Sequence, residues 1–297
     1  MRKAGAFVFL ITLFASYADA QSFYAIRRER SMIAVGGIGT STYLGELSNK
    51  GDYIDAKPTI NMGLQYYFTN SIALRSELTW YTLKGDDAKA DPESGRSPRN
   101  LSFTSSNFEF NVTGIVNFFP QGRRFYQRPG FNLYGFAGIG VTYFNPKTIY
   151  QGKKVALQPL QTELVKYSRI APVIPYGIGA RFKAGPFFNI AVEGGLRKTF
   201  TDYLDDVSTV HHDASKFSNP LAAALSDRRP EIGLPLAADG YIRGNPDKKD
   251  SYLLFTVKVE YYLPDNFFGA GSGQKKLNRN KRKAFYRYNK RRGGLKR

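Results

Sequence analysis

Apolar and polar residues alternate along several separate stretches of the chain. Within residues 72–83, apolar side chains occupy one face of an extended chain and mostly polar ones the other: Ile72, Leu74, Leu78 and Trp80 against Ala73, Arg75, Glu77, Thr79 and Tyr81. A helix would spread these charges around its whole circumference, whereas a strand separates them cleanly. Residues 107–118 and 253–263 repeat the same design. The period of two predicts β-strands.

Weaker alternation and the spacing of the connections complete the pattern. Residues 59–68, 174–183 and 188–197 alternate less regularly, and the Gly-rich residues 32–44 and 131–144 predict two further strands whose facing the pattern does not assign. Short links at 69–70, 120–130 and 184–186 alternate with long ones at 46–57, 84–101, 145–170 and 201–250. We therefore predict an all-β fold over residues 31–263, an eight-stranded antiparallel transmembrane β-barrel with short periplasmic turns and long extracellular loops.

Two consequences of this prediction concern the sixth strand and the chain ends. Pro172 and Pro175 lack the N–H that a closed ladder needs, so we expect a bulge or an irregular start of that strand. An even number of strands places both termini on the same side of the membrane, which we expect to be the periplasm.

Charged residues recur on the polar faces of the strands. A lipocalin-like barrel or a soluble sandwich would present them to water, whereas a membrane barrel would enclose them. The interior of an eight-stranded barrel is just wide enough for side chains to fill it. We therefore expect a paired, stabilising lumen network, with ion conduction or proton relay as the alternative, formed by Arg75, Glu77, Glu109, Arg181, Lys183, Glu193, Arg197, Lys258 and Glu260.

The first twenty residues have the pattern of a targeting segment. Arg2 and Lys3 precede an apolar stretch, and Ala18-Asp19-Ala20 follows it. We interpret residues 1–20 as a secretory signal peptide, with an uncleaved anchor as the alternative. Abundant aromatic residues and glycines, 20 Tyr, 23 Phe and 29 Gly, favour an integral barrel of the cell outer membrane. The absence of Cys excludes disulfides and thiol nucleophiles.

The formal net charge of +19 is concentrated near the C-terminus, where a basic tail covers residues 264–297. Behind a signal peptide, basic residues interleaved with aromatic ones suggest an acidic periplasmic protein or anionic lipid headgroups, including lipopolysaccharide, rather than nucleic acid. A solvated, unstructured tail is the alternative. The partner contacts we expect lie in the periplasmic segment 21–30 and in the tail: Arg27, Arg28, Arg30, Lys281, Arg282, Lys283, Phe285, Tyr286, Arg287, Tyr288, Lys290, Arg291 and Arg292.

Residues suited to catalysis are few. His211 and His212 stand side by side next to Asp213 in the longest loop, with Ser208 and Ser215 nearby. A triad needs a base held rigidly beside its nucleophile, and three consecutive residues rarely form a tetrahedral metal site. Acidic pairs at 86–87 and 205–206 and the nearby Asp202 offer oxygen ligands for calcium or for cations that bridge lipopolysaccharide, but capping of strand ends is the interpretation we prefer. We expect no enzyme activity, no metal site and no cofactor.

Several short strings occur in an order that resembles a known family. These are residues 43–47 (YLGEL), 85–87 (GDD), 99–103 (RNLSF), 174–179 (IPYGIG) and 200–206 (FTDYLDD). Together they resemble the Bacteroidota outer-membrane barrel family that includes PorG, a component of the type IX secretion system. The resemblance implies an accessory barrel in protein transport, bound to periplasmic ring proteins like PorK, a lipoprotein, and PorN. A lipid-modifying or proteolytic barrel enzyme and a surface adhesin or receptor remain as alternatives.

Overall fold

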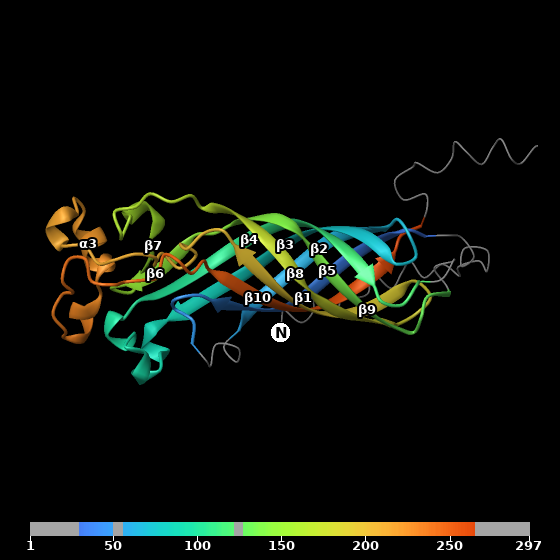
Figure 1. Cartoon of the computed structure of the whole chain (residues 1–297), viewed down its shortest axis with the longest axis horizontal. Helices are drawn as coiled ribbons and strands as arrows, with labels where there is room; N and C mark the ends of the chain where they lie inside the picture. The colour runs from blue at the N-terminus through green and yellow to red at the C-terminus, as the bar shows by residue number, and fades with distance from the viewer. Residues whose placement is uncertain (1–29, 50–55, 122–126, 265–297) are drawn as a thin grey trace, which may run out of the picture.

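The computed structural model describes residues 30–49, 56–121 and 127–264, and these form one closed antiparallel barrel (Figure 1). The wall consists of eight strands, each paired with its neighbours in chain order, and the last pairs with the first. The predicted eight-stranded barrel is confirmed. The strands of the wall are β1 (Met32–Leu44), β2 (Lys57–Tyr67), β3 (Ile72–Asp86), β4 (Ser102–Asn117), β5 (Phe131–Tyr143), β8 (Ile170–Lys183), β9 (Phe188–Thr199) and β10 (Ser251–Tyr262).

The barrel closes along a seam between β1 and β10. Pairing along this seam runs from Ile33 opposite Tyr262 to Leu44 opposite Ser251. Strands β3 and β4 pair from Ile72 to Asp86, further than the alternation in the sequence predicted, because residues 84–86 and 102–106 are mostly polar and small on both faces. This longer pair extends toward the long loops (Figure 1).

The outer surface of the wall is apolar. Large aliphatic side chains at its middle are mostly exposed, for example Ile38 at 68%, Ile139 at 73% and Ile178 at 70%. The alternation predicted for β3 is confirmed, because Ile72, Leu74 and Leu78 face outward while Arg75 and Glu77 are buried. So continuous an apolar surface is unfavourable in water and matches the lipid-facing band of a membrane barrel.

No helix in the described part of the chain is long and apolar enough to cross a bilayer.

The prolines of β8 do not produce the predicted bulge. Tyr176 faces Ala137 of β5, and Val173 faces Gly140, so the register is the same on both sides of Pro175. The pairing with β5 is interrupted only at the intervening residues, and the pairing with β9 runs through Pro175, which faces Arg197. Of the two alternatives, the bulge is absent and the irregularity near the start of the strand is a gap in one ladder, because the missing proline donor needs no inserted residue.

We call the end of the barrel that carries the long connections the loop end, and the opposite end, with links 68–71, 118–130 and 184–187, the turn end. The loop end is folded. A hairpin of β6 (Pro146–Tyr150) and β7 (Lys153–Ala156) attaches to β4, and α3 (Pro220–Ser226) lies in the longest loop (Figure 1). Short 3₁₀ turns complete it: η1 (Asp87–Lys89), η2 (Pro92–Ser94), η3 (Ser97–Arg99), η5 (Gln158–Leu160), η6 (Ala214–Lys216) and η7 (Arg229–Ile232).

A hydrophobic cluster holds these loops onto the barrel. Tyr43 and Phe103 of the wall meet edge to face at 5.0 Å between ring centroids, and Leu204 and Leu225 of the longest loop are buried in the same cluster. The largest apolar cluster therefore lies at the loop end. Two smaller ones lie elsewhere, one at the turn end around Ile33 and Tyr262 and one inside the barrel around Tyr134 and Phe136, among many buried polar side chains.

Candidate functional site: a filled lumen and a folded loop end

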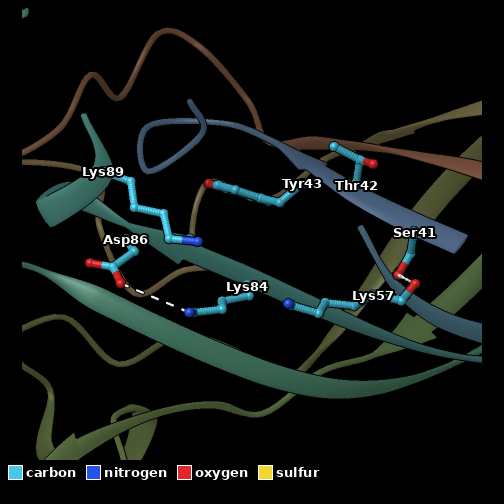
Figure 2. Close-up of a pocket in the computed structure, with 8 residues that line it drawn as sticks. Ser41, Thr42, Tyr43, Lys57, Lys84, Asp86 and Lys89 are labelled. Atoms are coloured by element: carbon cyan, nitrogen blue, oxygen red, sulfur yellow. Dashed lines mark hydrogen bonds and ion pairs between the residues drawn. The ribbon is translucent and has the colours of Figure 1, made fainter. Parts of the chain in front are cut away.

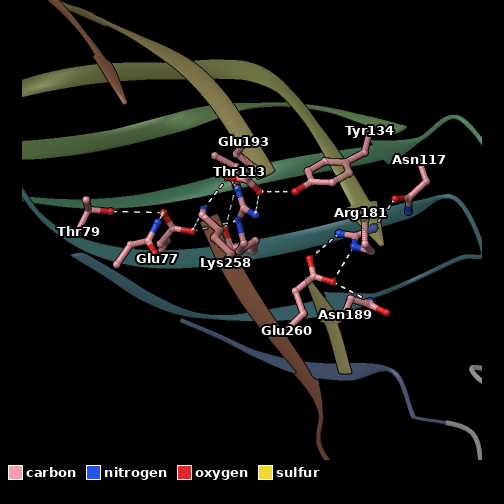
Figure 3. A network of polar contacts seen from close by, with 12 residues as sticks. Glu77, Thr79, Thr113, Asn117, Tyr134, Arg181, Asn189, Glu193, Lys258 and Glu260 are labelled. Atoms are coloured by element: carbon pink, nitrogen blue, oxygen red, sulfur yellow. Dashed lines mark hydrogen bonds and ion pairs between the residues drawn. The ribbon is translucent and has the colours of Figure 1, made fainter. Parts of the chain in front are cut away.

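The middle of the lumen holds four charged side chains in mutual contact (Figure 3). Arg75 forms a two-pronged ion pair with Glu193, and its Nε lies 3.3 Å from Glu77. The amine of Lys258 lies 2.6 Å from a carboxylate oxygen of Glu77 and 2.6 Å from one of Glu193. The hydroxyl of Tyr134 donates to Glu193 at 2.7 Å. Each charge therefore has an opposite charge within contact distance.

A second network lies nearer the turn end. Arg181 donates two hydrogen bonds to Glu260, at 2.6 and 2.8 Å, and a third to the amide oxygen of Asn117 at 2.7 Å (Figure 3). Asn189 donates to the same Glu260 at 2.9 Å. The guanidinium of Arg181 also lies over the ring of Tyr134, which links this network to the central one.

A third group lies nearer the loop end. Glu109 lies 3.7 Å from Arg197 and accepts hydrogen bonds from Tyr252 and Asn111. Tyr252 stacks on Tyr81, with ring centroids 4.6 Å apart. The lumen is thus filled along its length by alternating charged, amide and aromatic side chains.

Eight of the nine predicted lumen residues are buried, four basic and four acidic: Arg75, Arg181, Arg197, Lys258, Glu77, Glu109, Glu193 and Glu260. Lys183, the ninth, is exposed at the end of β8. Glycines on the inner face leave space for these side chains, since a Cβ at Gly37 would overlap Asn61 and Lys258, and one at Gly179 would overlap the ring of Tyr134. The alternation in the sequence placed Gly179 on the face of Arg181, but it did not show which face Gly37 occupies.

The predicted partner-binding residues fall mostly outside the described part of the chain. The signal peptide, Arg27, Arg28 and all tail residues from Lys281 to Arg292 lie there. Arg30 is described and is 9% exposed at the turn end. Its guanidinium donates to the carbonyl oxygen of Tyr262 at 2.8 Å and lies over the ring of Phe187. The side chain of Arg30 therefore packs against the barrel itself.

At the loop end, two of the predicted acidic positions are held by arginines. Asp87 is buried and forms a two-pronged pair with Arg99, at 2.9 and 3.0 Å. The carboxylate of Asp206 accepts hydrogen bonds from Thr162 and Tyr167, and Arg243 donates to the backbone carbonyl oxygen of Asp206 at 2.6 Å. Arg243 also pairs with the buried Glu163 at 2.6 Å, which itself accepts the backbone N–H groups of residues 208 and 209. These pairs hold the long loops together.

Four further acidic residues of the loop end lie together, and none of them forms an ion pair with a described residue. We call them the acidic cluster: Glu46, Asp202, Asp205 and Asp250. Glu46 follows β1, Asp202 and Asp205 follow β9, and Asp250 precedes β10. Asp205 and Asp250 both lie within hydrogen-bond distance of the hydroxyl of Tyr43. Sequence reasoning missed Glu46 and Asp250. Strand β10 pairs with β1 on one side and with β9 on the other, so the ends of these three strands bring all four residues together.

The electrostatics of the acidic cluster reflect this crowding. Burial, followed by the nearby Asp202, raises the pKa of Glu46 to about 7. Burial raises the pKa of Asp202 to about 6. For Asp205 and Asp250, burial and then the neighbouring carboxylates hold the pKa well above the usual range. The cluster therefore resists carrying its full negative charge without a proton or a cation.

Neither histidine lies beside a nucleophile. The imidazole nitrogens of His211 are buried and have no hydrogen-bond partner among the described residues, and Nδ1 of His212 lies 3.8 Å from Asp239. The hydroxyls of Ser208 and Ser215 donate to Asp202 and Asp213 instead. The described residues of this loop thus form no triad of serine, histidine and aspartate.

Among the hollows near the loop end, two are lined by several lysines. The first is lined by Lys57, Lys84 and Lys89 together with Tyr43 and Asp86, and its volume of about 10 Å³ accommodates no more than a water molecule (Figure 2). The second, of about 340 Å³, lies between β3, β4 and the hairpin and is lined by Lys84, Lys147 and Lys154 with Tyr143 and Ile149. It opens beside the apolar band of the wall.

Solved structures with a similar fold are small outer-membrane barrels. Neisserial surface protein A is 7% identical, with 78% of this chain and 97% of that chain covered at a TM-score of 0.40. Ail, the attachment invasion locus protein of Yersinia pestis, is 11% identical, with 79% and 99% covered at 0.38. A major outer membrane protein from Thermus thermophilus is 10% identical, with 78% and 99% covered at 0.40. Similarity this distant carries no conclusion about function.

No curated protein shows significant similarity to the chain. One family model matches residues 7–219, which is more than half of the sequence and includes seven of the eight wall strands. The chain therefore belongs to the family described as a domain of unknown function, DUF6089.

Proposed function

We propose that this barrel is an outer-membrane anchor in a protein secretion machine of the type IX kind and that it binds periplasmic ring proteins. The observation that carries the anchoring role is the filled lumen, in which four basic and four acidic side chains are buried. An eight-stranded barrel packed in this way is a rigid membrane plug and offers no open path to solutes. The link to the secretion machine rests on the ordered resemblance to the family that includes PorG.

The turn end is the face that we assign to the ring proteins. The first and the last strand of the wall meet at this end, since Ile33 and Tyr262 face each other across the seam (Figure 1). The residues that follow the last strand in the sequence are strongly basic. In this proposal their charge complements an acidic partner of the kind expected for a PorK-like lipoprotein or a PorN-like protein. Opposite charges guide the encounter, and ordinary salt weakens it. In this proposal the barrel has no catalytic role.

Affinity capture of the tagged protein from gently solubilised outer membranes tests the proposal. We expect mass spectrometry to identify a ring lipoprotein and its periplasmic companion, in amounts that fall as the salt concentration of the wash rises. A variant with Lys281, Arg282 and Lys283 changed to Gln should retain less of both partners. A matched variant with Lys147, Lys154 and Lys216 changed to Gln removes the same charge from the loop end and should retain them fully.

Two outcomes would contradict the proposal. Recovery of the barrel alone, under conditions in which other outer-membrane complexes stay intact, would remove the scaffold role. Equal partner loss in the tail variant and the loop-end variant would show that the contact does not depend on the tail charges.

A surface receptor is a second candidate, supported by one feature of the longest loop. From the last residue of η7 to β10 four large apolar side chains are exposed: Ile232 at 49%, Leu236 at 56%, Tyr241 at 60% and Ile242 at 72%. Exposed apolar groups on a folded loop suit protein binding. Replacing all four by Ser should abolish adhesion of whole cells to a host surface if this candidate is right, and should leave secretion unchanged.

A further inference from the structure

Three carboxylates of the acidic cluster meet at the loop end, directly beside the seam. One carboxylate oxygen each from Glu46, Asp202 and Asp250 lies within 4.8 Å of the other two. The three residues come from the segments that follow β1, follow β9 and precede β10, and these strands are consecutive in the wall. Barrel closure therefore creates this group from residues far apart in the sequence.

Two oxygens of this group are buried without a partner. Glu46 accepts the N–H of Asn245 at one oxygen, Oε1, while Oε2 is buried and has no hydrogen bond in the described structure. Asp202, only 2% exposed, accepts the hydroxyl of Ser208 at Oδ2, while Oδ1 is buried and likewise has no hydrogen bond. A buried carboxylate oxygen without a donor is costly, so both oxygens are available to a cation.

The third carboxylate is fixed in position by its neighbours. Asp250 accepts the backbone N–H of Leu204 at 3.0 Å and lies beside the hydroxyl of Tyr43. That hydroxyl also lies 2.8 Å from Asp205, and because it has one hydrogen it can donate to only one of the two carboxylates. Among the described residues, none of the four carboxylates forms an ion pair. Positive charge reaches the group only from a distance, from Arg99 near Glu46 and Lys249 near Asp202.

We propose that Glu46, Asp202 and Asp250 bind one divalent cation of the size of Ca²⁺, with Asp205 and Tyr43 holding Asp250 in place. Hard divalent cations take carboxylate oxygens, and Ca²⁺ is commonly held by several of them in flexible geometry. Three carboxylates that each place an oxygen within 4.8 Å of the other two can share one such ion. Mg²⁺ usually keeps several of its waters and binds through one or two carboxylates, so a group of three suits it less well. The ion would join both sides of the seam.

Calorimetric titration of the full-length protein in detergent, after treatment with a chelator, tests this site. With CaCl2 as the probe we expect one saturable site with a dissociation constant on the order of 10⁻⁴–10⁻³ M, the range of extracellular calcium modules. Asp202→Asn and Glu46→Gln keep the side-chain shape and remove one charged ligand each. Each should weaken binding by more than the about tenfold that loss of an outer-shell partner costs.

The matched control is Asp239→Asn, which removes an exposed carboxylate of the same loop that pairs with Lys216. Its calcium affinity should equal that of the unmodified protein. A second readout is hydrogen exchange of residues 46–48 and 202–206, which Ca²⁺ should slow in the unmodified protein and in the control, but not in Asp202→Asn.

Three results would overturn the proposal. The first is an unmodified protein that shows no saturable heat with CaCl2 and no slowing of exchange, which would mean that a shared proton neutralises the cluster. The second is calcium binding that survives both Asp202→Asn and Glu46→Gln unchanged. The third is tighter binding of MgCl2 than of CaCl2, which would contradict the inferred ion size. Since the two substitutions lie on different loops, failure of one variant to fold leaves the other as a test.

Discussion

The lumen and the loop end both bury carboxylates, but they neutralise them by different means. In the lumen each acidic side chain contacts a basic one, as Glu193 does with Arg75 and Lys258. In the acidic cluster Glu46, Asp202 and Asp250 contact hydroxyls, backbone N–H groups and one another. The first arrangement is complete within the chain, whereas the second requires something from solution, either protons or a cation.

This difference separates a permanent part of the structure from a responsive one. A buried ion pair holds its geometry over a wide range of pH and salt, because both charges are fixed by the fold. A carboxylate cluster with raised pKa values changes its charge with the solution around it. The barrel is thus expected to be insensitive to conditions that alter the order of the loop end.

The largest effect should come from breaking the lumen network. Glu193→Ala leaves Arg75 and Lys258 short of one buried partner and should lower the free energy of unfolding by about 3–5 kcal/mol, measured by urea unfolding in lipid vesicles. The exposed Glu93 provides the control, since Glu93→Ala removes the same group at the surface and should change little. Equal losses in the two variants would mean that the buried pairs are not what stabilises the barrel.

A smaller and local effect should follow from crowding the acidic cluster. A Cβ at Gly45 would overlap both the hydroxyl of Tyr43 and a carboxylate oxygen of Asp250, so Gly45→Ala should push the two apart. Overpacking of this kind costs about 1–3 kcal/mol. We expect faster hydrogen exchange in residues 202–206, with unchanged exchange in β3 and β4. Gly130→Ala, which places its Cβ in open space at the turn end, should change neither region.

His211 should cause a pH effect in the longest loop. Burial, then the charge of Arg243, lowers the pKa of His211 from its usual 6.5 to about 4. The unfolded loop therefore takes up a proton that the folded loop does not, and the stability contributed by neutral His211 is lost as the pH falls from about 6.5 toward 4. Exchange of residues 209–243, corrected for its intrinsic pH dependence, should accelerate over this range.

His211→Phe should reduce that acceleration, whereas His212→Phe, at the half-buried neighbouring position, should preserve it. The opposite pattern, or equal behaviour of the two variants, would assign the transition to other groups.

The smallest effect should come from an exposed ion pair of the same loop. Lys216 and Asp239 lie 2.6 Å apart with about half of each side chain exposed, so water and salt screen the pair. Lys216→Gln should leave the urea midpoint of unfolding unchanged at physiological salt. A clear shift of the midpoint would show that this exposed ion pair contributes to stability as the buried pairs of the lumen do.

The strands of the wall were predictable because polar and apolar residues alternate along them with a period of two, and this alternation shows which side chains face inward. The charges of residues 72–83 and 253–263 alternate with large apolar residues, so one strand at a time reveals both its presence and its inner face. The glycine-rich strands gave no such signal. A glycine on the inner face makes room for the side chain opposite it, as Gly37 does for Lys258. The residue opposite is known only once the register of the closed barrel is known.

The loop end was less predictable for the same reason. The hairpin of β6 and β7 has no clear alternation, and the pairing of Glu163 with Arg243 joins two separate loops. From the sequence we placed the acidic residues 86–87, 202 and 205–206 at strand ends and interpreted them as caps of those strands. Asp86, the last residue of β3, does cap a 3₁₀ turn, whereas Glu46, Asp202 and Asp250 come together only because β1, β10 and β9 are neighbours.

The seam between β1 and β10 also governs how the molecule is completed. β1 is the first strand of the wall to be synthesised and β10 the last, so a growing chain carries two unpaired edges until its final strand is in place. Open edges recruit strands from other molecules, while a closed ring has none to offer. Residues 33–44 therefore have to pair with residues 251–262 before the protein is protected against pairing with strands of other molecules.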